Sequence, residues 1–206
     1  MFSIFAFHSE GATITRSGLL VVSSRDSALG GAFELGDIFN YTLSYDDAVV
    51  DSDSEPGYGE FVGAITSFTI VPNTVRPSIW TPSGSMGTGT VMTETVAPQT
   101  WTFSVTADLG YGPAVSGFDP TLFYMGFGGL PANGDIGGGQ TLGQVTGSIL
   151  DNVTMGSSNF VEFSFENGAN SHLVNFDLIN FHAPEPSRSV LVLAGFMGLV
   201  WRRTRR

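Results

Sequence analysis

Six acidic side chains crowd one short segment of the chain. They are Asp46, Asp47, Asp51, Asp53, Glu55 and Glu60. Carboxylate oxygens at alternate positions are ligands that Ca²⁺ takes in proteins. An EF-hand loop beginning at Asp51 would place Pro56 where glycine is required and Val62 where a bidentate glutamate is required. The EF-hand interpretation therefore fails. The segment 46–60 is predicted to be a solvated acidic loop, and a less regular calcium site is the alternative.

Glu162 and Glu166 are a candidate pair of catalytic carboxylates, since both fall on one face of a predicted strand. Four residues at about 3.3 Å each separate them by roughly 13 Å. Paired carboxylates that hydrolyse glycosides lie roughly 5–9.5 Å apart. The two glutamates are therefore predicted to be solvent-facing strand residues.

The chain has three histidines, at positions 8, 172 and 182. His8 and His182 lie near the two termini, so His172 is the one that a Ser-His-Asp site in the body would need. No Gly-x-Ser-x-Gly motif accompanies it. We interpret His172 as a surface residue at a strand end, and the sequence predicts no catalytic residue, metal ligand or cofactor.

Two further groups of residues could form a binding site. The first group is a glycine-rich stretch made of Gly126, Gly128, Gly129, Gly134 and Gly137 to Gly139. It lacks the Gly-x-Gly-x-x-Gly spacing of a dinucleotide-binding loop, so a flexible loop is predicted there. Four aromatic side chains could stack on sugar rings if they share one face: Tyr58, Trp80, Trp101 and Tyr111. Tyr58 and Trp80 fall in loops and are the expected exposed pair, whereas Trp101 alternates as a core residue.

Composition removes several kinds of chemistry. The chain has no lysine and no cysteine among its 206 residues. A P-loop and a Schiff-base enzyme each need a lysine, while thiol catalysis and cysteine zinc sites need sulfur. Residues 1–184 carry three arginines against 18 carboxylates, a net charge of −15. This part of the chain lacks the cations that neutralise phosphates, so nucleic-acid binding is excluded.

The elements that must position these residues are predicted to be strands. Glycine, proline, threonine, valine and phenylalanine are abundant, which opposes helices and favours short strands joined by turns. Alternating apolar and polar residues indicate about nine strands, at 12–23, 41–45, 61–71, 88–96, 101–106, 121–127, 141–150, 161–166 and 172–181. The expected fold is all-β, an antiparallel β-sandwich or jelly roll over residues 12–182, plus a short C-terminal hydrophobic helix. Turn-rich loops are expected at 46–60, 72–87 and 126–139.

The C-terminal segment 183–206 has a different character. Pro184, Glu185 and Pro186 would end the last strand, and 13 uncharged residues follow from Ser189 to Trp201. Four arginines close the chain: Arg202, Arg203, Arg205 and Arg206. As a helix the uncharged run would be about 20 Å long, shorter than a bilayer core of roughly 30 Å. The segment is predicted to be a marginal membrane stop with a cytoplasmic basic end, and a buried core helix is the alternative.

The order of these three features resembles the PEP-CTERM protein-sorting signal of Gram-negative bacteria. The resemblance covers only the last 23 residues or so. It implies export across the inner membrane, recognition by a membrane-embedded exosortase, cleavage near Pro184–Pro186, and delivery to the cell surface or extracellular matrix. Proteins with this signal are often associated with exopolysaccharide. The same tail is also catalogued as a C-terminal domain of ice-binding proteins. Because the tail is a sorting signal, this name does not imply that the rest of the chain binds ice.

Export should require a signal peptide, and residues 1–11 resemble only part of one. Phe2 to Phe7 is a short apolar run without a preceding basic residue. Ser9-Glu10-Gly11 could be a cleavage site before Ala12. We expect residues 1–11 to be the end of a truncated signal peptide.

Together these features predict a non-enzymatic exported protein of the cell surface or matrix, in the membrane only as a precursor. An extracellular carbohydrate-binding module is the first alternative. A jelly-roll hydrolase or lyase is the second.

Overall fold

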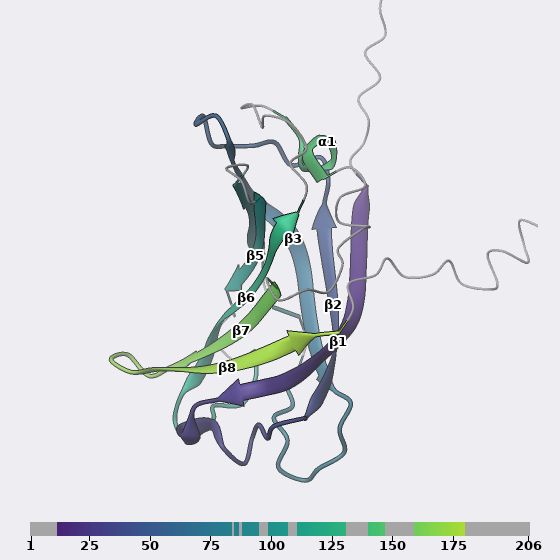
Figure 1. Cartoon of the computed structure of the whole chain (residues 1–206). Coiled ribbons are helices and arrows are strands. Elements are labelled where there is room, and N and C mark those ends of the chain that lie inside the picture. The colour runs from purple at the N-terminus through teal and green to yellow at the C-terminus, as the bar shows by residue number, and fades with distance from the viewer. Residues whose placement is uncertain are drawn as a thin grey trace, which may run out of the picture.

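A computed structural model describes residues 12–83, 85–86, 88–94, 99–106, 111–130, 140–146 and 159–179 (Figure 1). Within these residues the chain forms eight strands: β1 (Thr13–Arg25), β2 (Ile38–Asp46), β3 (Tyr58–Pro72), β4 (Gly89–Glu94), β5 (Gln99–Thr106), β6 (Asp119–Leu130), β7 (Asn159–Glu166) and β8 (Ser171–Leu178). The same described ranges contain two short helices, η1 (Ser27–Leu29) and α1 (Leu142–Thr146). The predicted signal remnant 1–11 and the sorting segment 183–206 lie outside the described residues.

The strands form one closed antiparallel barrel in the order of the chain. Each strand pairs with the next, and β8 returns to pair with β1 through partners such as Leu20 and Leu178. The all-β antiparallel prediction is confirmed, but the strands share a single curled sheet and do not divide into two facing sheets (Figure 1). Closure pairs the backbone groups that an open sheet would leave exposed at its two edges.

Eight of the nine predicted strands are present, and the prediction of a strand at 141–150 is wrong over its described residues, 141–146. There, Thr141 caps the short helix α1. The backbone N–H of Gln144 donates to Thr141 Oγ1 at 3.3 Å, and the backbone N–H of Thr141 donates to Gln144 Oε1 at 2.8 Å. This reciprocal pair is a capping box, whose Thr-x-x-Gln spacing is visible in the sequence. The loop predicted at 126–139 also begins later, because β6 continues to Leu130.

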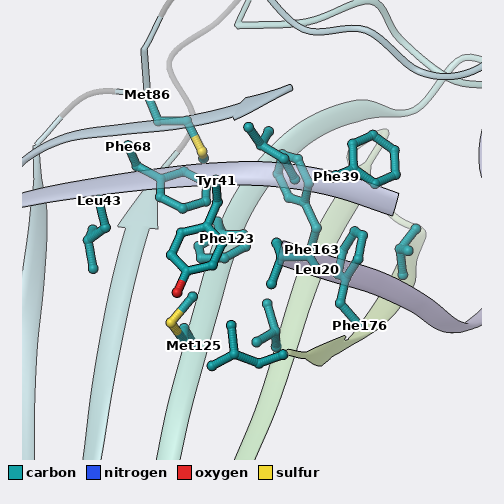
Figure 2. Close-up of a cluster of buried hydrophobic side chains, with 14 of the residues drawn as sticks. Leu20, Phe39, Tyr41, Leu43, Phe68, Met86, Phe123, Met125, Phe163 and Phe176 are labelled. Carbon is teal, nitrogen blue, oxygen red and sulfur yellow. The ribbon is translucent and has the colours of Figure 1, made fainter. Parts of the chain in front are cut away.

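Aromatic side chains fill the barrel interior. The period of two along each strand sends alternate residues inward, and the ten largest fully buried side chains are all aromatic: Tyr41, Tyr45, Phe33, Phe39, Phe61, Phe68, Phe123, Phe127, Phe163 and Phe165. Figure 2 shows part of this cluster, in which the Phe68 and Phe123 rings stack with centroids 4.0 Å apart. An eight-stranded barrel is just wide enough for side chains to fill it, and the buried hydrophobic residues form one cluster inside it.

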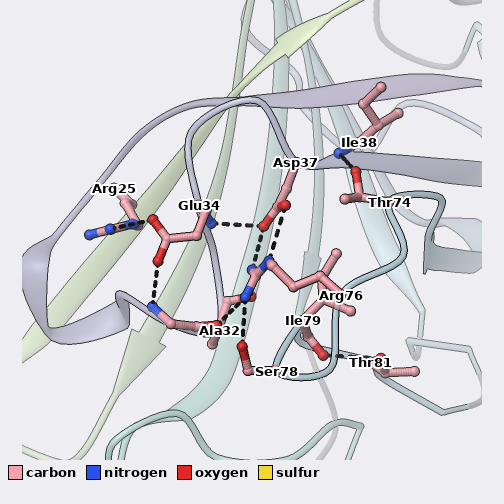
Figure 3. A network of polar contacts seen from close by, with 11 residues as sticks. Arg25, Ala32, Glu34, Asp37, Ile38, Thr74, Arg76, Ser78, Ile79 and Thr81 are labelled. Carbon is pink, nitrogen blue, oxygen red and sulfur yellow. Dashed lines mark hydrogen bonds and ion pairs between the residues drawn. The ribbon is translucent and has the colours of Figure 1, made fainter.

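One end of the barrel, here called the η1 end, is closed by the segments 26–37, 73–86 and 111–118. The backbone N–H of Trp80 donates to the carbonyl of Ala32, and that of Ser83 donates to the carbonyl of Tyr111. An ion pair between Arg76 and Asp37 fastens the first two segments together (Figure 3). Arg76 also donates to the backbone carbonyls of Gly31 and Ala32. The side chain of Asp37 is only 5% exposed.

Candidate functional site

The acidic segment 46–60 uses its carboxylates to hold its own backbone. Asp51 Oδ1 accepts the backbone N–H groups of Asp53 and Glu60, both at 2.9 Å. Asp53 Oδ1 accepts the N–H of Glu55 at 2.8 Å, and Asp46 does the same for Ala48 at 2.9 Å. The expectation of a solvated loop is wrong for Asp51, which is 7% exposed. The described residues contain no group of three metal-ligating side chains, so a calcium site has no support in this part of the chain.

The two glutamates of β7 lie on the outside of the barrel. Glu162 is half-buried and stands in register between Tyr124 of β6 and Asn175 of β8. Glu166 is exposed and stands opposite Asp119, which is exposed as well. Register therefore brings Glu166 beside Asp119, which the sequence did not predict, and keeps it apart from Glu162. An exposed pair on a strand end differs from a catalytic pair, which lies in a concave pocket with its substrate.

His172 connects β8 to the turn before η1. Its Nδ1 lies 3.1 Å from Asp26 Oδ2, which also accepts the backbone N–H of Leu173 at 3.1 Å. The imidazole packs edge-to-face on Phe118, with ring centroids 4.4 Å apart. The side chain is 27% exposed and stands near the start of β8, as predicted for a histidine at a strand end. His8 and His182 lie outside the described residues.

The predicted exposed aromatic residues are mostly not exposed. Trp80 is 2% exposed and Tyr111 is 4% exposed, because both plug the η1 end of the barrel. Trp80 Nε1 donates to the carbonyl of Pro113 at 2.9 Å. Tyr58 is half-buried. Trp101 lies on β5, and its side chain is not among those that the structure describes. The expectation that Trp80 is exposed is therefore wrong.

A different pair of aromatic rings lies on the outer face of the barrel. Tyr124 of β6 and Phe160 of β7 stack with ring centroids 5.2 Å apart and planes at 26°. Phe160 is 37% exposed and Tyr124 is half-buried. The sequence carries a signal for this pair, since Tyr124 and Phe160 are out of phase with the inward residues Phe123 and Phe163. We call Tyr124 and Phe160 the outer ring pair.

A glycine beneath the outer ring pair sets the position of Phe160. Gly126 faces Phe160 across the β6–β7 ladder. A Cβ at Gly126 would lie 2.2 Å from Phe160 Cζ and 2.3 Å from its Cε1. The far edge of the ring therefore occupies the space above Gly126 and lies across β6. A side chain at position 126 would displace it.

Polar residues border the outer ring pair, and the described cations lie elsewhere. Glu162 stands next to Tyr124 in one cross-strand row, and Asn175 follows on the far side of Glu162. Asn175 Nδ2 donates to Ser24 Oγ at 2.8 Å, which leaves its Oδ1 as an acceptor. The three arginines in the described residues are buried or paired: Arg16 is 5% exposed, Arg25 pairs with Glu34 and Arg76 pairs with Asp37.

The sequence matches no protein-family model, and neither the curated proteins nor the solved structures contain a significantly similar chain. Among the described residues, no helix has both the length and the apolar character needed to cross a membrane. The predicted sorting residues lie outside that description: Pro184, Glu185, Pro186, Arg202, Arg203, Arg205 and Arg206.

Proposed function

We propose that this chain is an exported bacterial protein that is sorted and processed through its segment 183–206 and comes to reside at the cell surface or in the extracellular matrix. The observation that carries this proposal is the order of Pro184–Pro186, an uncharged run and a terminal arginine cluster. An exosortase-type membrane enzyme is the partner that this order implies. The inner membrane holds the precursor only transiently.

We also propose that the barrel has no catalytic role and acts through its outer surface. One feature supports this: buried aromatic side chains occupy the interior of the barrel. A body with 18 carboxylates against three arginines is strongly charged, and such charge keeps a protein soluble.

The sorting proposal is tested by following an epitope-tagged full chain in a bacterial host that contains an exosortase-type enzyme. One variant lacks Pro184–Pro186, and a matched control lacks the three residues Ser187–Ser189. We expect the control to be shortened and delivered like the wild type, and the first variant to stay unprocessed in the membrane fraction. Identical processing and localisation of both variants would contradict the sorting proposal.

A carbohydrate-binding module remains the second candidate function. The observation that favours it is the outer ring pair with its polar border. A jelly-roll hydrolase or lyase gains no comparable support from the described residues.

A further inference from the structure

We propose that the outer face of β6 and β7, centred on Tyr124 and Phe160, binds a neutral sugar ring of a polysaccharide. This site goes beyond the sorting proposal and does not depend on it, since every residue that carries it lies in the barrel. It also differs from the pair that the sequence suggested for stacking on sugar rings, Tyr58 and Trp80.

The rings offer the surface that a pyranose ring recognises. The face of an aromatic ring is electron-rich, and the axial C–H groups of a sugar carry partial positive charge. The far edge of the Phe160 ring lies over Gly126, and 37% of the residue is exposed, so part of the ring is open to a ligand. Tyr124 stacks against Phe160 with ring centroids 5.2 Å apart, so two aromatic rings lie together at this place on the outer face.

The outer ring pair is held in place before any ligand arrives. Phe160 lies against Gly126 and stacks on Tyr124. Tyr124 stands in register with Ser104 of β5 and Glu162 of β7, and Phe160 stands in register with Gly126 of β6. Preorganisation of this kind lowers the entropy that binding costs.

The polar border supplies partners for sugar hydroxyl groups. Glu162 stands in the same row as Tyr124 and provides carboxylate acceptors. Asn175 stands next in that row, and its side-chain amide nitrogen is already bonded to Ser24. Its carbonyl oxygen therefore remains to accept from a hydroxyl. Stacking on the rings and donation to Glu162 and Asn175 would fix both the plane and the rotation of the sugar.

Charge and size decide which occupant fits. The arginines of the described residues are buried or paired away from this face, while Glu162 lies on it, so an anionic polysaccharide would be repelled. Among the residues of β4, β6 and β7 whose side chains the structure describes, the large exposed apolar ones are Met92, Leu122 and Phe160. A stable protein interface takes about 20–30 residues from each partner, so this apolar strip is too small for one. A neutral sugar needs only the two rings and a few hydrogen-bond acceptors.

The test uses the purified full chain in native affinity electrophoresis through gels that contain one polysaccharide each. The panel consists of neutral glucans, xylan and galactomannan, with alginate as an anionic member. We expect retardation by at least one neutral polysaccharide and none by alginate. Phe160→Leu keeps an apolar cover over Gly126 but removes the aromatic face, and Tyr124→Ala removes the second ring. Each should weaken binding by about 2- to 12-fold, the range of an aromatic pair contact.

The matched control is Val71→Ala, which shortens a 54%-exposed apolar side chain on β3, away from the ring pair. It should bind like the wild type. Far-ultraviolet circular dichroism and thermal unfolding establish that each variant is folded. The proposal is overturned if no neutral polysaccharide retards the wild type, or if Phe160→Leu and Tyr124→Ala bind as well as Val71→Ala. Sedimentation showing a wild-type dimer that Phe160→Leu dissociates would also overturn it, since a second copy would then be the occupant.

Discussion

Trp80 should be one of the residues on which the stability of the barrel most depends. The sequence places it in a loop, but its ring centroid lies 5.5 Å from that of Phe33, 5.1 Å from that of Phe163 and 5.4 Å from that of Phe165. Trp80→Ala removes these contacts and opens a cavity at the η1 end. Replacing a buried tryptophan or phenylalanine by alanine lowers the free energy of unfolding by about 3–5 kcal/mol. At about 2–4 °C per kcal/mol for a chain of this size, the unfolding temperature should fall by about 6–20 °C.

Two further variants separate the causes of this loss. Trp80→Phe keeps a ring but leaves the Pro113 carbonyl without its hydrogen bond, which should cost about 1–3 kcal/mol. Val75→Ala changes a fully exposed residue of the same connecting segment and should alter stability by less than about 0.5 kcal/mol.

Thermal unfolding followed by circular dichroism measures all three variants. Acrylamide quenching of tryptophan fluorescence adds an independent readout, because a buried Trp80 should be shielded from the quencher. The reasoning is refuted if Trp80→Ala unfolds at the wild-type temperature, or if Val75→Ala is equally destabilised.

Three other predictions follow from buried polar groups. Arg76→Ala leaves the Asp37 carboxylate buried without its ion pair, which should lower the free energy of unfolding in urea by about 3 kcal/mol. An unfolding midpoint equal to that of the wild type would contradict this prediction. Burial raises the pKa of Tyr111 from its ordinary value of 10.0 to about 12. The unfolded chain therefore loses this proton first, stability falls as the pH rises from about 10 to 12, and Tyr111→Phe should lessen that fall in urea unfolding at these pH values. Asp51→Ala removes the acceptor of two backbone N–H groups and should lower the free energy of unfolding by about 2–3 kcal/mol. Asp51→Asn keeps the Oδ1 acceptor and should lower it by less. Equal urea midpoints for the two variants would show that the acceptor is unimportant.

Local pattern predicted the strands well and the candidate site poorly. The period of two along β7 identified Val161, Phe163 and Phe165 as inward residues, and all three are buried. The same period would have marked Phe160 as outward. It could not show that Gly126 stands opposite Phe160, because cross-strand register depends on the turns and bulges between strands. The short helix α1 was missed because its capping box spans only four residues, in an uncharged stretch whose threonine and valine residues favour strands.

Trp80 shows where sequence reasoning must fail. Apart from Ile79, its neighbours in the chain are polar or turn-forming, which is typical of an exposed loop. Its neighbours in space are Phe33, Phe163 and Phe165, which come from segments far away in the sequence. Whether a loop aromatic is buried depends on the open end of the barrel that the loop covers, and no local pattern describes that end.

The sequence by itself determined the all-β class, eight of the strand positions and the exclusion of lysine and cysteine chemistry, because these follow from side-chain types and their local spacing. It also contains the order of residues at 183–206 on which the sorting proposal rests. Only the tertiary structure decided that the strands close into one barrel, that Trp80 plugs its end, and that Tyr124 and Phe160 meet above Gly126. These features depend on contacts between distant segments, which are set by strand register and closure.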